Sequence, residues 1–285
     1  MAARNIYLLT GGTSGIGLSA ATTIAQLDPG SHLLLVGRDP NRGQSAATEV
    51  ASHGATAEFV QADLSLIADN ERVAQRALTT AGRLRAFVPS AGIVDPKKKI
   101  TADGLDWMFA TYYVSRYILA RRLLPALRSH GDGRIATVGA KFPPKFSLNF
   151  VEDQQSAAYR FPAVMPRVML SNFLLHQQIA TTEGPSGVKA NIMHPGIVVT
   201  NIMREMPAPV QWAMRAAAPL LTRVEVPGAL AARLAAGAVD FSGCIIANPA
   251  RIDSRRSIAA PAEICARYFA DTEAFLARKG VRFES

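Results

Sequence analysis

The chain has 285 residues, of which 49% are hydrophobic and 19% charged, an ordinary balance for one globular α/β domain with a sizeable core. Its formal net charge of +9 is scattered, and the one tight basic cluster, Lys97, Lys98 and Lys99, has no interleaved aromatic residues, so nucleic-acid binding is not predicted. The two cysteines, Cys244 and Cys265, lack metal-ligand spacing, which predicts no metal site and indicates a reducing compartment.

Strand-like and helix-like segments alternate along the chain, which predicts a parallel sheet covered by helices on both faces. We therefore expect a Rossmann-type doubly wound α/β sheet of about seven strands, in a single domain over residues 1–285. Ser65 fits the N-cap of the third helix, and Pro261 suits the first turn of the last one. The expected strands are 6–10, 32–36, 57–61, 86–88, 134–138, 189–194 and 244–247, and the expected helices are about 15–27, 40–53, 66–81, 103–129, 164–183, 226–238 and 261–278.

The stretch 201–223 breaks this alternation. It is long and apolar and carries prolines, methionines and Trp212. Such a segment is typical of a lid over a bound ligand, and equally of a surface excursion packed on the core.

A glycine-rich run follows the first expected strand and opens the first expected helix. Gly11 permits a tight turn, Gly15 lets the backbone approach a pyrophosphate, and Gly17 allows helix and strand to pack closely. The helix N-terminus then presents amide donors and a positive dipole end to phosphates. The predicted cofactor contacts in this run are Gly11, Thr13, Ser14, Gly15, Ile16 and Gly17.

The run spells T-G-x-x-x-G-x-G, and in this it resembles the short-chain dehydrogenase/reductase family. Three further segments are similar to family motifs: Ala62-Asp63-Leu64, Ser90-Ala91-Gly92 and the turn from His194 to Thr200. The resemblance implies that Asp63 contacts the adenine and that the last turn holds the nicotinamide carboxamide. The cofactor contacts it implies are Asp63, Leu64, Ser90, Ala91, Gly92, Pro195, Gly196, Val198 and Thr200.

The residues after the second expected strand predict the cofactor. Enzymes selective for NAD place a carboxylate here, which accepts hydrogen bonds from the ribose hydroxyls. This chain has Arg38, whose guanidinium suits a 2′-phosphate, and Arg42 one turn later can assist. We therefore predict NADP(H), while Asp39 keeps NAD open as an alternative.

The catalytic tetrad of the family, an asparagine, a serine, a tyrosine and a lysine, is altered. Residues 149–172 are similar, without a gap, to the retinol-dehydrogenase-like branch, which places Met165 on the tyrosine and Met169 on the lysine. By the same resemblance, Ala140 stands for the serine and Tyr112 for the asparagine. Thioethers neither donate a proton nor carry charge, so ordinary ketone reduction should be poor.

Three hypotheses remain open. The first is hydride transfer to an activated substrate, an iminium ion or a strongly polarised enone. In the second, Tyr112, Lys141, Asp153 or Tyr159 replaces the lost acid, although each also fits an ordinary structural role. In the third, the scaffold serves cyclisation, isomerisation or catalytically inactive nucleotide binding.

Of these we favour a reductase in specialised metabolism, with a small-molecule substrate. No signal peptide and no apolar run of roughly 20 residues is found, which predicts a cytoplasmic protein without a membrane span. The resemblance makes a homodimer or homotetramer plausible, paired through the helices at 103–129 and 164–183.

Overall fold

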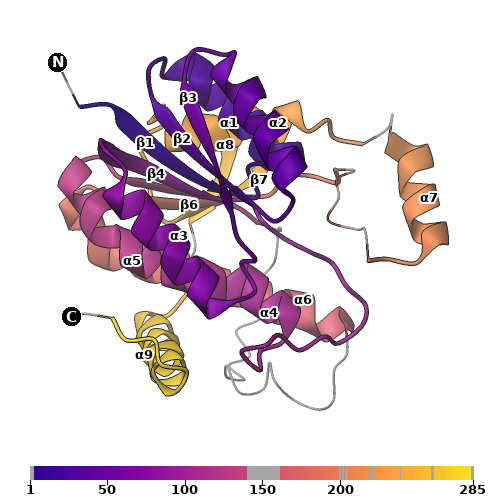
Figure 1. The fold of residues 1–285 in the computed structure, drawn as a ribbon. Helices are drawn as coiled ribbons and strands as arrows, with labels where there is room; N and C mark the ends of the chain where they lie inside the picture. Colours follow the sequence, from indigo (N-terminus) through magenta and orange to yellow (C-terminus); the bar gives the residue numbers. More distant parts are fainter. Residues whose placement is uncertain are drawn as a thin grey trace.

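One sheet of eight strands runs through the described part of the chain, in the order β3-β2-β1-β4-β5-β6-β7-β8 (Figure 1). The computed structural model describes residues 3–139, 161–198, 200, 202, 205–218, 221–237, 239–257 and 260–283. Strands β1 to β7 pair in parallel, and β8 runs antiparallel to β7 at one edge. The strands are β1 (Asn5–Thr10), β2 (His32–Gly37), β3 (Thr56–Gln61), β4 (Arg83–Pro89), β5 (Arg134–Val138), β6 (Lys189–Met193), β7 (Cys244–Asn248) and β8 (Arg251–Ser257).

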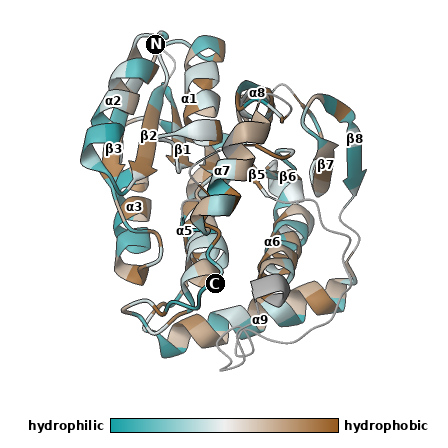
Figure 2. Cartoon of the chain, turned by 90° about the vertical axis from the view of Figure 1, so that its right-hand side faces the viewer, coloured by the Kyte–Doolittle hydropathy of each residue, from teal (hydrophilic) through white to brown (hydrophobic). Residues whose placement is uncertain are grey.

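Helices cover both faces of this sheet. In Figures 1 and 2, α1, α2 and α8 lie on one face and α3, α5 and α6 on the other, while α7 stands apart and α9 crosses α5 and α6. None of the described helices is both long and apolar enough to cross a membrane. The helices are α1 (Gly15–Leu27), α2 (Pro40–Ala51), α3 (Ile67–Thr79), α4 (Trp107–Phe109), the π-helical turn η1 (Ala110–Val114), α5 (Ser115–His130), α6 (Phe161–Glu183), the 3-10 turn η3 (Gly184–Ser186), α7 (Ala208–Ala217), α8 (Glu225–Ala235) and α9 (Ala262–Arg278).

The two faces of β1 explain why its sequence is apolar throughout. Successive side chains of a strand point to opposite faces, and here both faces are covered. Ile6 and Leu8 pack into the core on the side of α3, α5 and α6. Tyr7 and Leu9 pack into the core on the side of α1, α2 and α8. The doubly wound fold is thereby confirmed.

The sheet has eight strands rather than the expected seven, and the additional strand is β8. Strand β8 has the sequence RIDSRRS and is largely exposed, because it pairs with β7 on one side and forms the edge of the sheet. An edge strand with one solvated face carries polar and charged residues, and the search for apolar runs therefore missed it.

The helices also differ in detail from those expected. The helix predicted over 103–129 is divided into α4, η1 and α5. The N-cap of α3 is Leu66 rather than Ser65, whose hydroxyl instead donates to Asp63 Oδ1 at 2.8 Å. Pro261 is the N-cap of α9, one residue before its first turn. The segment 201–223 contains α7, and Trp212 on this helix is 73% exposed.

Helix α9 is held to α5 and α6 by polar contacts. The Tyr113 phenol lies 2.7 Å from Thr272 Oγ1, and Arg121 pairs with Glu273 at 2.7 Å. Tyr268 of α9 lies 2.5 Å from the Ser171 hydroxyl of α6. The helices expected to pair subunits correspond to α5 and α6, and part of their surface is therefore covered by the chain's own last helix.

Candidate active site

A cavity of about 440 Å³ opens at the carboxyl ends of β1 and β4, where the strand order reverses. In doubly wound sheets this switch point is the usual place for a ligand. Gly17 does not line the cavity; it packs beneath it. The other predicted cofactor contacts line it: Gly11, Thr13, Ser14, Gly15, Ile16, Arg38, Asp63, Leu64, Ser90, Ala91, Gly92, Pro195, Gly196, Val198 and Thr200.

The glycine-rich turn has no room for side chains at two of its glycines. Gly11 has φ +70, and a Cβ there would lie 2.7 Å from the backbone nitrogen of Ala91. A Cβ on Gly17 would lie 2.2 Å from the carbonyl oxygen of Gly11. The turn therefore holds the N-terminus of α1 directly against the end of β1, where its amides face the cavity. This geometry fits a pyrophosphate.

The end of β2 places one cation and one carboxylate at the cavity. Asp39 is the N-cap of α2, and its Oδ1 accepts from the backbone nitrogens of Asn41 and Arg42 at 3.0 and 3.1 Å. Its Oδ2 lies 3.5 Å from Arg42 Nε. The Arg38 guanidinium lies 5.8 Å from the ring centroid of Trp107. The carboxylate is thus occupied by capping, and the guanidinium of Arg38 is held against an aromatic face at the cavity.

The two methionines line the side of the cavity that lies opposite the nucleotide-binding residues. Met165 and Met169 are one turn apart on α6, so both side chains lie on the same helix face, and Met169 is only 3% exposed. Gly139, which directly follows β5, also lines the cavity. The remaining candidates, Ala140, Lys141, Asp153 and Tyr159, lie outside the described residues.

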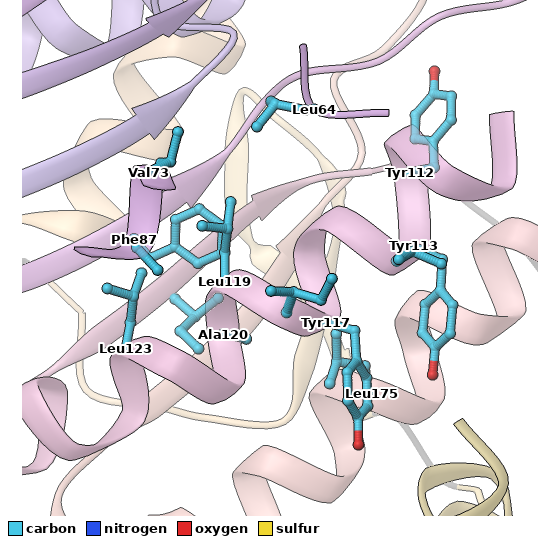
Figure 3. Packing of buried hydrophobic residues seen from close by; sticks show 14 of the residues in the cluster. Leu64, Val73, Phe87, Tyr112, Tyr113, Tyr117, Leu119, Ala120, Leu123 and Leu175 are labelled. Atoms are coloured by element: carbon cyan, nitrogen blue, oxygen red, sulfur yellow. The ribbon is translucent and has the colours of Figure 1, made fainter. Parts of the chain in front are cut away.

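Tyr112 lines the cavity from the facing helix. It lies in η1, and Figure 3 shows its ring leaving the helix in the direction opposite to Tyr113. A Cβ on Gly92 would lie 2.6 Å from the Tyr112 hydroxyl oxygen. The phenol therefore rests on the Ser90-Ala91-Gly92 turn, next to the predicted cofactor contacts.

Arg116 is a functional candidate that the sequence analysis missed. It lines the cavity four residues after Tyr112, is 3% exposed, and forms no ion pair with any carboxylate in the described part of the chain. Its Nη2 donates to the carbonyl oxygens of Ala91 and Val138, each at 3.1 Å. Burial lowers the pKa of Arg116 to about 10, which leaves it charged at neutral pH. The cavity therefore contains a buried positive charge.

A buried histidine supports α6 behind the methionines. His176 Nε2 lies 2.6 Å from Thr137 Oγ1 on β5, and its Nδ1 lies 2.8 Å from the Asn172 carbonyl oxygen. Burial lowers the pKa of His176 to about 4, so its ring is neutral at pH 7. Asn172 Oδ1 in turn lies 3.4 Å from Arg116 Nη1. His176 thus joins β5 to α6 without adding charge.

Fold and cavity together define a Rossmann-type dinucleotide-binding protein. The family model "short chain dehydrogenase" matches residues 5–143. Human polyprenol dehydrogenase is 28% identical over 76% of this chain and 66% of its own length, and mouse retinol dehydrogenase 14 is 26% identical over 71% and 64%. The chain thus spans about two thirds of the length of these relatives.

Solved structures share the same fold. A candidate NAD(P)-dependent gluconate 5-dehydrogenase from Beutenbergia cavernae, with NADP bound at low occupancy, superposes with a TM-score of 0.64 at 26% identity, over 82% of this chain and 90% of that one. A short-chain dehydrogenase from Sphingobium yanoikuyae in complex with NADPH matches in fold, with a TM-score of 0.57 at 24% identity, over 75% and 82%. The comparisons confirm the predicted resemblance of this chain to the short-chain dehydrogenase/reductase family and to its retinol-dehydrogenase-like branch.

Proposed function

We propose that this protein is an NADP(H)-dependent reductase whose substrate is already polarised for hydride addition, and that this substrate is an enone. The observation that carries the proposal is the pair Met165 and Met169 on the wall of the cavity. By the family resemblance, these are the positions of the tyrosine acid and its lysine.

The cofactor assignment rests on the end of β2. Arg38 offers a planar guanidinium, which suits a 2′-phosphate, whereas the Asp39 carboxylate is occupied at the N-cap of α2. The solved neighbours that carry NADP or NADPH agree with this assignment. When bound, the reduced dinucleotide supplies the hydride.

The methionines favour a substrate that does not depend on the usual acid. A positioned acid contributes roughly 10²–10⁴-fold to such a reaction, and a thioether cannot provide it. The same side chains make the wall apolar and adaptable, which suits a bulky hydrophobic substrate. Such a substrate is consistent with an intermediate of specialised metabolism.

Arg116 favours an enone over an iminium ion. An iminium would bring a second positive charge into a cavity that already contains an unneutralised guanidinium. Hydride addition to an enone has the opposite effect, because negative charge develops on the carbonyl oxygen. A buried cation beside the cavity stabilises that charge.

The test is incubation with stereospecifically deuterated NADPH and matched panels of enones, iminium ions and plain ketones. We expect deuterium at the β-carbon of an enone and slow or no transfer to ketones. Transfer to iminium ions in preference to enones would contradict the substrate assignment. Substrate consumption without label would point to a cyclase or isomerase, and cofactor binding without turnover to an inactive binding protein, and either would overturn the reductase.

A further inference from the structure

Tyr112 and Arg116 stand four residues apart, on the helix that faces the two methionines across the cavity. We propose that Tyr112 donates the proton that completes the reduction, and that Arg116 is a positioning residue that stabilises the phenolate left behind. This assignment rests on the proposed function and names the groups that act in it. The family's tyrosine and lysine provide a phenol and a cation one helical turn apart. Tyr112 and Arg116 would provide the same two groups on the wall that faces Met165 and Met169.

The geometry of the pair suits this role. The Arg116 guanidinium carbon lies 5.3 Å from the centroid of the Tyr112 ring, so the charge is held over the aromatic face. The phenol oxygen lies beside the Gly92 turn, and the residue lines the cavity. The cation is thus held over the ring face of a phenol that stands at the wall of the cavity.

Arg116 is fixed by its surroundings rather than by an acidic partner. Its Nη2 contacts the carbonyl oxygens of Ala91, which follows β4, and of Val138, which ends β5, while Nε has no hydrogen-bond partner among the described residues. Carbonyl oxygens orient the guanidinium without cancelling its charge. The positive charge of Arg116 therefore acts on Tyr112, the ionisable group on which the guanidinium stacks.

The π-helical turn η1 sets the direction of Tyr112. Residues Ala110–Val114 form one wide turn between α4 and α5. Such turns are uncommon and occur often at functional sites, because they rotate the following side chains relative to an uninterrupted helix. Here Tyr113 points into the aromatic core and bonds to Thr272, while Tyr112 points to the cavity (Figure 3).

Other charged and titratable groups also line the cavity. Those at the ends of β2 and β3 include both signs of charge, and Asp39 and Asp63 are engaged in hydrogen bonds with local backbone or hydroxyl groups. His176 of α6, behind the methionines, is neutral at pH 7. The groups that line the cavity besides Tyr112 and Arg116 are Arg38, Asp39, Arg42, Asp63 and His194.

In the proposed reaction the proton comes from Tyr112 and is replaced from solvent. Hydride addition at the β-carbon moves the alkene pair toward the carbonyl, whose oxygen becomes an enolate. Tyr112 breaks its O–H bond and transfers the proton to that oxygen, which gives an enol that tautomerises to the saturated ketone. The phenolate, stabilised by Arg116, then takes a proton from solvent. No oxidant or reductant other than the reduced dinucleotide is needed.

A titration of tyrosine absorbance in the protein without cofactor or substrate tests the pair. Four of the six tyrosines, Tyr7, Tyr113, Tyr117 and Tyr268, have their pKa values raised by burial, that of Tyr268 to about 12. In a Tyr159→Phe background, the absorbance change below roughly pH 11 therefore reports Tyr112.

We expect one tyrosine to titrate in that range, and Tyr112→Phe to abolish the signal. Arg116→Met should move the midpoint up by about one pH unit or more, since an opposite charge at this distance has an effect of that size. Arg116→Lys, which keeps the charge, should retain most of the wild-type midpoint. Arg122→Met is the matched control on the same helix, because Arg122 pairs with Glu71 at 2.8 Å and does not line the cavity.

Two outcomes would overturn the pair. An unchanged midpoint in Arg116→Met would show that the guanidinium does not act on the phenol. Arg116→Gln removes the same charge and is the second variant if Arg116→Met fails to fold, and an unchanged midpoint there would also overturn the pair. Because the titration uses neither cofactor nor substrate, its failure leaves the enone reduction open, whereas failed label transfer leaves the pair intact.

Discussion

The two sides of the cavity are built from different parts of the chain. On the nucleotide side, the closely packed backbone of a short turn lines the cavity with residues between Gly11 and Ile16, and Gly17 packs against that backbone. On the opposite side, the surface consists of side chains from η1, α5 and α6, such as Tyr112, Arg116 and Met169. A backbone surface tolerates little change because any added atom collides with it. The side chains on such a surface can change while the fold persists, and here two of them, Met165 and Met169, carry sulfur.

The largest expected effect is on the nucleotide side. Gly17→Ala would bring a Cβ to 2.2 Å from the Gly11 carbonyl oxygen, so α1 must move away from β1. We expect NADPH affinity to fall by about 150-fold, or ~3 kcal/mol, in a fluorescence titration. Gly184→Ala is the control, since nothing lies within 4 Å of the added atom. Near-normal affinity in Gly17→Ala would show that this turn does not hold the cofactor.

On the opposite side of the cavity, formed by η1, α5 and α6, we expect activity to rise when the two methionines are changed to the tyrosine and lysine of the family. The double variant Met165→Tyr with Met169→Lys restores a phenol and an ammonium one turn apart on α6. We expect plain ketone reduction to rise about 100-fold, the lower end of the value of a positioned acid. Met165→Phe with Met169→Leu is the control, because it changes shape without adding an acid. No gain over that control would mean that the family register of these two positions is wrong.

Acid should lower the stability of the protein through His176, which lies on α6 on the same side of the cavity. Its pKa is about 4 in the folded protein and about 6.5 when exposed, so protonation favours the unfolded chain. The stability that the neutral ring confers is complete above pH 6.5, falls as the pH drops toward 4, and changes no further below that. Between pH 6.5 and 5 we expect a loss of roughly 2 kcal/mol in urea unfolding.

His176→Gln should remove that part of the pH dependence, whereas His53→Gln, at a partly exposed position, should keep it. Hydrogen exchange would sharpen the contrast between the two sides. We expect amides of α6 to lose protection on acidification before those of α1. Equal loss in both helices would mean that the two sides unfold as one unit.

The smallest expected effect concerns cofactor selectivity. Arg38→Gln removes the guanidinium at the end of β2 and leaves the capped Asp39 in place. A hydrogen bond to a charged group contributes ~1.5 kcal/mol, so the preference for NADPH over NADH should fall about tenfold in paired binding titrations. Arg42→Gln should have a smaller effect, since that side chain pairs with Asp39. An unchanged preference in Arg38→Gln would place the phosphate contact elsewhere.

Most of the fold could be predicted from the sequence because its causes are local. Seven strands read as short, mainly apolar runs, since helices cover both faces of the sheet, and the glycine turn lies within seven consecutive residues. The exceptions are elements whose sequence carries no such signal. Strand β8 is a charged edge, and the long helix is divided at η1, where Tyr113 contacts Thr272 of α9.

The site divides in the same way. The sequence by itself predicted the glycine-rich turn, the arginine after β2 and the two methionines as parts of one site, because each is read from neighbouring residues. Only the tertiary structure decided that Arg116 lies buried at the cavity, since its contacts come from the turn after β4 and from the end of β5. It also decided that Asp39 caps α2 and that His176 joins α6 to β5. Burial and charge environment depend on residues distant in the chain, and no local pattern records them.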